Sequence, residues 1–316
     1  MNRSRPVLAI VVPCYNEEVQ LPITINTLLD LLKNLKTSEL IADESWVVFI
    51  DDGSKDNTWQ VIQQHATGNK AVKGIKLACN SGHQAALMAG LMESREASDC
   101  TLSIDADLQH DISVIPEMLK LFSHGSDIVT GVRLNRAGDT KMKKVLSNGY
   151  YWVMQKMGTP IQPQHADFRL LGKNVLDALA NFPERNLFLR GVIASMGFNS
   201  QTVSYVQQER NFGESKYTLF KMLSLAWNGI TSFSSFPLRI SVFLSIFTML
   251  LAILVAISTF IDWLDGDTVL GWSSIMLTML FLGSIQLFCV AVLGEYIAKI
   301  YAEVKRRPHY IIEKKV

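Results

Sequence analysis

Residues 101–110 read Thr-Leu-Ser-Ile-Asp-Ala-Asp-Leu-Gln-His, an apolar run that ends in two aspartates, Asp105 and Asp107. A second apolar run, residues 46–50, ends in the acidic pair Asp51-Asp52 and a glycine-serine turn. Short apolar runs bounded by turn residues are typical of buried strands. In open α/β sheets, ligands bind in the crevice at the carboxyl ends of the strands. The two acidic pairs therefore predict a site for a metal and a nucleotide diphosphate.

Segments with strand and helix character alternate through the first 131 residues. This alternation predicts an α/β domain with a doubly wound parallel sheet. The pattern weakens from there to about residue 200. The expected strands cover residues 7–12, 46–50, 75–78, 101–104 and 127–131, and the expected helices run from 16 to 32, from a cap at Asp56 or Asn57, from 84 to 92 and from 115 to 122.

The hydrophobic fraction of 48% is high for a purely soluble protein, and the excess lies near the C-terminus. Residues 240–261 and 269–293 carry no formal charge. Both runs exceed the ~20 residues that a helix needs to cross a bilayer core. We therefore expect two transmembrane helices. The alternative is a pair of buried core helices.

Charges around these runs predict their orientation. The connecting residues 262–268 carry three aspartates, whereas the outer flanks carry Arg239, Lys299, Lys305, Arg306 and Arg307. By the positive-inside rule both ends lie in the cytoplasm. The N-terminus does not resemble a signal peptide, so we expect a multi-pass protein of the cell membrane with a cytoplasmic catalytic domain and both termini cytoplasmic.

Residues 214–237 form a separate segment. Apolar residues recur there at helical spacing opposite Lys216, Lys221 and Asn228, which predicts an amphipathic helix in the membrane interface. A helix packed on the globular domain is the alternative. The expected organisation is a cytoplasmic domain over 1–213, this interfacial segment over 214–237, a transmembrane hairpin over 238–298 and a basic cytoplasmic tail over 299–316.

Composition excludes two other classes. The net charge is +1 and no basic stripe is present, so a nucleic-acid partner is not expected. The four cysteines show no paired metal-ligand spacing, and a reducing compartment argues against a disulfide framework.

The sequence contains neither a Walker-type phosphate-binding loop nor a dinucleotide fingerprint. Phosphate must therefore be held another way, and Mg²⁺ or Mn²⁺ on one or two carboxylates is the obvious candidate.

Three motifs together carry a family resemblance. They are Pro13-Cys-Tyr-Asn-Glu17, Asp51-Asp-Gly-Ser54 and Asp105-Ala-Asp107, each after an apolar run. In this order they resemble the family 2 glycosyltransferases, whose nucleotide-sugar-binding domain has a GT-A-like fold. Each motif is weak alone, and the ordered set is specific.

The resemblance narrows to the polyprenyl-phosphate glycosyltransferases, which include dolichol-phosphate mannose synthase and the bactoprenol glucosyltransferases. It covers almost the whole chain. Three segments match the group as a whole: Asp105–His110, Gly131-Val-Arg133 and Arg210-Asn-Phe-Gly-Glu-Ser-Lys216-Tyr217. Three others favour the bactoprenol branch: Asp167-Phe-Arg169, Glu184-Arg-Asn-Leu-Phe188 and Ser235-Phe-Pro-Leu-Arg239.

The resemblance also implies roles for individual residues. Metal and diphosphate would be held by the Asp-Ala-Asp turn, through Asp105, Ala106, Asp107 and Gln109. A lipid phosphate or the leaving diphosphate would be gripped by Arg133, Arg210 and Lys216, because guanidinium and ammonium groups suit phosphate. The base and ribose of the donor would be held by Pro13, Tyr15, Glu17 and Asp52.

Asp167 has two interpretations that the sequence leaves open. It resembles a residue proposed as a base in the bactoprenol branch, where it would act in catalysis or orient the acceptor. It could instead form a structural ion pair with Arg169 or Arg185. His83 and His110, near the motifs, are expected to be local hydrogen-bonding residues rather than metal ligands.

The implied reaction is inverting transfer of one sugar from a nucleotide sugar to polyprenyl (undecaprenyl) phosphate at the cytoplasmic membrane face, for modification of cell-envelope glycans. UDP is favoured over GDP, UDP-glucose or a related donor fits, and copies are expected to associate through the membrane helices. A processive polysaccharide synthase is the first alternative, although Gln207-Gln-Glu-Arg210-Asn211 lacks the Trp of its motif. A membrane-anchored nucleotide-sugar sensor without turnover is the second.

Overall fold

The computed structural model describes residues 5–134, 165–182, 189–206, 236–264 and 271–316. They fall into two compact units. The sheet unit contains the described residues up to 206 together with 308–316, and the helical unit contains 236–264 and 271–307. The predicted interfacial helix over 214–237 lies outside the described residues, except for its last two positions.

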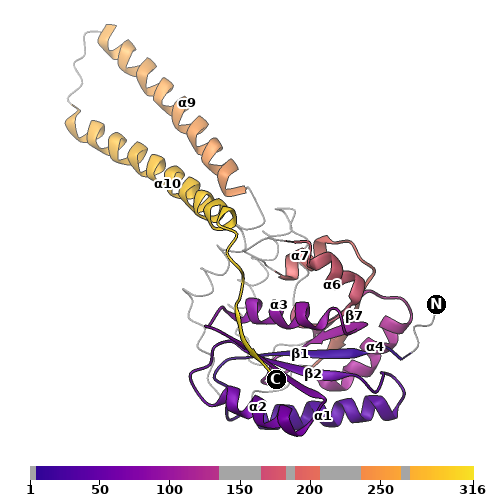
Figure 1. The fold of residues 1–316 in the computed structure, drawn as a ribbon. Helices are drawn as coiled ribbons and strands as arrows, with labels where there is room; N and C mark the ends of the chain where they lie inside the picture. Colours follow the sequence, from indigo (N-terminus) through magenta and orange to yellow (C-terminus); the bar gives the residue numbers. More distant parts are fainter. Residues whose placement is uncertain (1–4, 135–164, 183–188, 207–235, 265–270) are drawn as a thin grey trace. The chain divides into compact units, whose positions relative to one another are not determined.

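Four parallel strands form the first half of the sheet unit. Their spatial order is β4-β1-β2-β3, and every neighbouring pair is parallel. The parallel arrangement predicted for this half is confirmed. In Figure 1, α1 and α2 cover one face of this half and α3 the other. The elements are β1 (Leu8–Cys14), α1 (Leu21–Thr37), β2 (Trp46–Asp51), α2 (Thr58–Gly68), β3 (Val72–Leu77), α3 (His83–Ser94) and β4 (Cys100–Ser103).

The second half of the sheet is mixed. Strand β6 lies between β4 and β5 and runs antiparallel to both, whereas β5 and β7 are parallel. The sheet as a whole is therefore not purely parallel; β6 lies in the stretch in which the sequence pattern weakens, and β7 begins where that stretch ends. The elements are η1 (Ile112–Val114), α4 (Ile115–Ser123), β5 (Ile128–Arg133), β6 (His165–Gly172), α6 (Lys173–Leu179), α7 (Leu189–Ser195) and β7 (Ser200–Tyr205).

A last strand, β8 (Ile312–Lys315), closes the other edge of the sheet by pairing antiparallel with β3. Gly74 and Val316 exchange two backbone hydrogen bonds of 2.9 Å. Lys315 Nζ lies 2.5 Å from Glu93 Oε2 on α3. The segment that the sequence predicts as a basic tail thus contains a strand that returns to the sheet unit.

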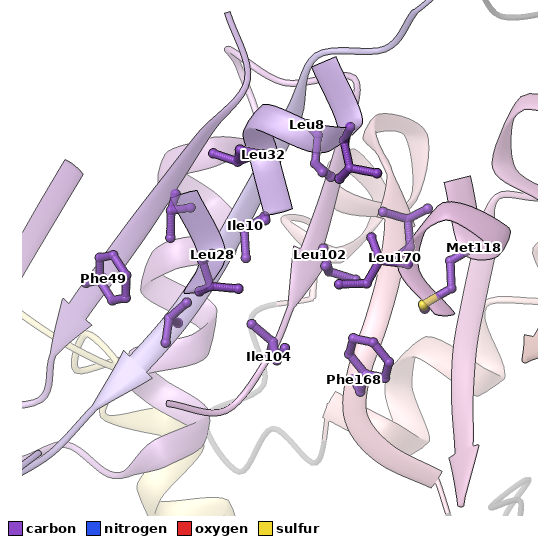
Figure 2. Packing of buried hydrophobic residues seen from close by; sticks show 14 of the residues in the cluster. Leu8, Ile10, Leu28, Leu32, Phe49, Leu102, Ile104, Met118, Phe168 and Leu170 are labelled. Carbon is purple, nitrogen blue, oxygen red and sulfur yellow. The ribbon is translucent and has the colours of Figure 1, made fainter. Parts of the chain in front are cut away.

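The core that fixes this sheet lies against β1, whose seven residues are all buried. Figure 2 shows Leu28 and Leu32 of α1 packed over Ile10 of β1 and Leu102 of β4. Each buried side chain of this size contributes roughly 1.5–3 kcal/mol relative to an exposed one. On the opposite face, a Cβ at Gly90 of α3 would lie 2.3 Å from Val11 Cγ1, so only glycine lets α3 approach the strands. The strand ends are therefore held rigidly.

The helical unit contains α9 (Phe236–Leu264) and α10 (Trp272–Val304). Each is long and apolar enough to cross a membrane, over Pro237–Val255 and Phe281–Val304. Only 6% of either stretch is buried, which argues against buried core helices. The helices differ from the predicted runs at both ends: α9 extends from Phe236 through Leu264, and α10 begins at Trp272 and continues through Val304, beyond the predicted end at residue 293.

Candidate functional site

The carboxyl ends of β1, β2 and β4 lie at one edge of the sheet because these strands are parallel neighbours. Cys14 and Asp51, the last residues of β1 and β2, are paired. The predicted motifs follow these strand ends, so they come together as expected. The site has two sides: the donor side consists of the loops after β1 and β2, and the reaction side consists of the turn after β4 and the groups around it.

On the donor side, side chains of one loop bind the backbone of the other. The Asn16 amide donates to Ser54 Oγ at 2.9 Å, and the Lys55 amide donates back to Asn16 Oδ1 at 2.8 Å. The Glu17 amide donates to Thr58 Oγ1 at 2.8 Å. Asn16 has φ +54°, a left-handed conformation that asparagine tolerates. These hydrogen bonds hold the two loops in a fixed arrangement relative to each other.

Asp56 extends this connection to the start of α2. Its Oδ1 accepts from Thr58 Oγ1 at 2.6 Å, and its Oδ2 accepts from the Glu18 amide at 3.2 Å. Although partial burial raises it, the hydrogen bonds from Thr58 and the backbone leave the pKa of Asp56 below its ordinary value. Glu18 Oε2 in turn accepts from both the amide and the side chain of Asn57 at 3.0 Å.

The predicted donor-binding residues occupy different environments on this side. Pro13 lies within β1, next to Ile50 of β2, and the Tyr15 side chain is exposed. Asp52 is buried, and its two carboxylate oxygens accept from the amides of Ser81 at 2.7 Å and Gly82 at 3.0 Å. Asp52 thereby fixes the loop that leads into α3. A direct contact of Asp52 with base or ribose stays a prediction.

On the reaction side, the antiparallel register explains why Asp105 meets Asp167. Ser103 of β4 is paired with Arg169 of β6. Asp105 lies two residues beyond the end of β4 and Asp167 two residues before Arg169 on β6, so this register brings the two aspartates to the same end of the strand pair. Ser103 Oγ also donates to the Asp167 carbonyl at 2.5 Å. Strand β6 therefore carries a third carboxylate to the site.

Asp167 is held by a fork from Arg190, the second residue of α7. Arg190 Nε donates to Oδ1 at 3.0 Å and Nη2 donates to Oδ2 at 2.9 Å. Arg169 Nη2 lies 3.6 Å from Oδ1. Although burial opposes it, the contacts with His83, Arg190 and Arg169 hold the pKa of Asp167 far below its ordinary range. Of the predicted ion-pair partners, Arg169 is present, Arg185 lies outside the described residues, and Arg190 was missed.

His83, the first residue of α3, lies between two carboxylates. Its Nε2 is 3.5 Å from Asp167 Oδ2 and 3.7 Å from Asp105 Oδ1. Burial lowers the pKa of His83, but the two carboxylates outweigh burial and leave it above its ordinary value. The expected local polar role of His83 is therefore consistent with its position, while the partners could not be read from the sequence.

Two hydrogen bonds hold the Asp-Ala-Asp turn in place. Thr24 Oγ1 of α1 donates to the Ala106 carbonyl at 2.6 Å, and the Gln109 amide donates to Asp107 Oδ1 at 3.2 Å. Burial, and then the charge of Asp167, raise the pKa of Asp105, although His83, Arg133 and Arg190 act in the opposite direction. A cation would relieve this unfavourable burial of charge.

His110 ends the motif inside an aromatic cluster. Its ring stacks on Phe168 with centroids 5.0 Å apart and meets Tyr205 edge-on at 5.8 Å. Among the described residues, neither ring nitrogen of His110 has a hydrogen-bond partner, although Nε2 lies 3.7 Å from Asp105 Oδ2. The predicted local hydrogen bond of His110 is therefore not formed with any residue that the structure describes. Burial lowers the pKa of His110 to about 4.

Arg133 reaches the site from the end of β5. Its Nε donates to the hydroxyl of buried Tyr205 at 3.1 Å, a partner that the sequence analysis missed. The other two predicted phosphate-binding residues, Arg210 and Lys216, lie outside the described residues.

The donor atoms at the turn suit a divalent cation that is shared with substrate. Within the described ranges, no group of three or more His, Cys, Asp or Glu side chains is placed to hold a metal. Mg²⁺ and Mn²⁺ with diphosphate need only one or two carboxylates, since phosphate oxygens and water complete the shell. Asp105 and Asp107, with Gln109 beside them, fit that requirement.

Comparison with known proteins agrees with this geometry. Residues 9–179 match the model of glycosyl transferase family 2, and residues 236–300 match the GtrB C-terminal hairpin. An uncharacterized glycosyltransferase of Bacillus subtilis, YkoT, is 47% identical over 99% of this chain and 93% of its own length. The SfII prophage-derived bactoprenol glucosyl transferase of Shigella flexneri is 38% identical over 97% of both chains. A prophage bactoprenol glucosyl transferase homolog of Escherichia coli is 36% identical over 97% of this chain and 98% of its own.

Proposed function

The chain belongs to glycosyl transferase family 2, and from this premise we propose that it transfers a single glucose or related sugar from a UDP-sugar to polyprenyl phosphate, with undecaprenyl phosphate as the acceptor. The observation that carries the proposal is the nearly full-length similarity, hairpin included, to proteins named bactoprenol glucosyl transferase. The product would supply a sugar for cell-envelope glycans.

The donor side supports a nucleotide site. Hydrogen bonds join its two loops, and a preorganised site lowers the ordering cost of binding. Exposed Tyr15 offers a ring for the base. Pro13, Glu17 and Asp52 complete the proposed pocket.

The reaction side supports displacement at the anomeric carbon with inversion. A lipid monophosphate has a second pKa near 6, so at neutral pH its oxygen is already anionic. That oxygen forms the bond to the anomeric carbon, and the bond from this carbon to the nucleotide diphosphate breaks with its electron pair leaving on the diphosphate. No proton has to be removed, so the site has to align the groups and neutralise charge.

Charge neutralisation falls to the turn and to the basic groups. Asp105, Asp107 and Gln109 would hold Mg²⁺ or Mn²⁺, which when bound supplies positive charge to the departing diphosphate. Arg133, with Arg210 and Lys216, would bind phosphate. The Arg133 guanidinium is oriented for this by its bond to Tyr205.

The path of the chain supports a hairpin anchor. Strand β8 follows α10 and pairs with β3 of the sheet unit, which itself precedes α9. If α9 and α10 both cross the membrane, they return the chain to the side on which it started. With Lys299, Lys305, Arg306 and Arg307 near that end, the proposed side is the cytoplasm. Association of copies through the two helices remains part of the proposal.

The decisive experiment uses the full chain in detergent or nanodiscs with undecaprenyl phosphate and a panel of UDP- and GDP-sugars. Nucleotide release and mass spectrometry of the extracted lipid are the readouts. We expect one sugar on one lipid phosphate. A polymer would favour a processive synthase, and nucleotide binding without transfer from any donor would favour a sensor.

Membrane orientation has its own experiment. In a background with exposed Cys79 replaced by serine, Asp265→Cys should be labelled by an impermeant maleimide from outside intact cells. Lys314→Cys should be labelled only after the cells are opened. Labelling of both positions, or of Lys314→Cys alone, would contradict a cytoplasmic sheet unit.

A further inference from the structure

We propose that Arg190 is a further phosphate-binding residue of this site, and that Asp167 is the positioning residue that holds it rather than a base. This inference rests on the proposed function for the identity of the phosphate, which is that of the lipid acceptor. The observations that carry it are the fork between the two side chains, their unequal burial and the charge of their surroundings.

The fork fixes the direction of the Arg190 guanidinium. Two parallel N–H···O bonds of 3.0 and 2.9 Å restrain a planar group far better than a single contact does. The backbone beneath it is fixed as well, because Leu189 and Val192 of α7 are buried in the core. An arginine restrained at both ends loses little further freedom when it binds an anion.

Burial differs between the two arginines that contact Asp167. The Arg169 side chain is only 5% exposed, whereas the Arg190 side chain is 35% exposed and the Asp167 side chain 11%. Of the two guanidinium groups on Asp167, that of Arg190 is therefore the one that a ligand can reach.

The position of this charge matches the chemistry of the acceptor. The charges of Arg190 and Arg133 both act to lower the pKa of Asp105, the proposed metal ligand. His83 contacts both Asp105 and Asp167 from α3. A phosphate dianion brought to the anomeric carbon beside this turn would meet Arg190 on the β6 side of the site.

The same geometry makes Asp167 a poor base. A carboxylate that accepts a guanidinium fork and faces a second arginine is stabilised as the anion. A phosphate acceptor also presents no proton to remove at neutral pH. Asp167 instead holds the Arg190 guanidinium in position, so a substitution of Asp167 should affect the reaction by displacing Arg190.

Steady-state kinetics of the full chain tests this with UDP-glucose and undecaprenyl phosphate. Arg190→Gln should raise the acceptor KM by ~10-fold or more, with a smaller change in the donor KM, the fold expected for one charge-assisted contact. Arg190→Lys should recover part of the loss. Asp167→Asn should shift the acceptor KM in the same direction, and the double variant should be no worse than Arg190→Gln alone.

The matched control is Arg95→Gln, a surface arginine that contacts Glu96 and Asp177 away from the site, and it should leave both KM values unchanged. Unchanged UDP binding by the Arg190 variants would show that they fold. An unchanged acceptor KM in Arg190→Gln would overturn the proposal. So would an Asp167→Asn variant that loses kcat with its acceptor KM intact, as a base would require.

Binding of a short-chain polyprenyl phosphate, measured without donor, separates this inference from the proposed function. If Arg190→Gln binds the lipid more weakly and the parent protein transfers no sugar, then the phosphate site is supported and the proposed transferase function is refuted. Equal binding by the parent protein and Arg190→Gln would refute the phosphate site, whatever the turnover.

Discussion

The donor side and the reaction side share one edge of the sheet but are held together differently. On the donor side, hydrogen bonds between side chains and backbone join two loops, with Asn16, Ser54 and Thr58 as typical partners. On the reaction side, charged groups from α3, β4, β6 and α7 meet, and Asp167 with Arg190 is the central pair. The first arrangement fixes the shape of the two loops. The second brings together charged groups, which the proposed substrate and cation would contact.

The largest effect should come from the reaction side. Asp105→Asn or Asp107→Asn keeps the shape but removes charge, and each should lower kcat by about 100- to 1,000-fold, the cost of one lost transition-state contact. The measurement is single-sugar transfer at saturating substrates with added Mg²⁺ or Mn²⁺. Full activity of the parent protein in excess chelator would contradict the metal assignment and would place the two aspartates in another role.

The next effect concerns stability at low pH. Unfolded His110 takes up a proton near pH 6.5, whereas in the folded protein burial lowers its pKa to about 4. Unfolding is therefore favoured increasingly as pH falls from 6.5 toward 4, by at most about 3 kcal/mol, with no effect above pH 6.5. His110→Phe should flatten this part of a plot of melting temperature against pH.

Exposed His124 supplies the control for that experiment. A His124→Gln variant should keep the pH dependence of the parent protein. If His110→Phe also keeps the pH dependence of the parent protein, then protonation of the buried His110 ring is not the source of that dependence.

A smaller effect is expected on the donor side. Asp56→Asn weakens the bonds to Thr58 and to the Glu18 amide, so the loops should lose part of their fixed shape. We expect the donor KM to rise by ~10-fold, about 1.4 kcal/mol, with kcat within twofold. Asp43→Asn serves as the control, because Asp43 precedes β2 and the loop with Asp56 follows the other end of that strand. A fall in kcat with an unchanged donor KM would contradict the assignment of Asp56 to donor binding rather than to turnover.

The smallest effect should come from the far end of α3. Helix α3 carries His83 at its first turn and Glu93 near its last, where Lys315 of β8 contacts it. Lys315→Ala removes an exposed ion pair worth about 0–1 kcal/mol, so the melting temperature should fall by no more than a few degrees. Activity should be unchanged. A strong loss of kcat would mean that the reaction side depends on the sheet edge through α3.

The donor side could be predicted from the sequence because its information is local. The chain at β1, β2 and β4 is mostly apolar, and each motif begins at or just after the end of its strand. Parallel neighbours then bring the motifs together without further information. The bonds between the loops could not be foreseen in detail, since they depend on the rotamers of Asn16, Asp56 and Thr58.

The reaction side was only partly predictable because its parts are distant in the sequence. Asp105 and Asp107 stand in a recognisable turn, but Arg190 lies on a short helix in a stretch with weak periodicity. Asp167 comes near Asp105 only through the antiparallel register of β6, and His83 contacts both carboxylates. Tyr205, the partner of Arg133, ends a strand whose residues are mostly exposed and polar, a poor strand signal.

Strand β8 also orders events in time. It pairs with β3, yet in the chain it follows both apolar helices. During synthesis the sheet therefore lacks one edge until α9 and α10 have been made, and β3 has an unpaired strand edge during that interval. Completion of the sheet therefore has to wait until both apolar helices have been synthesised, and a chain stalled before β8 would present an open sheet edge to chaperones and proteases.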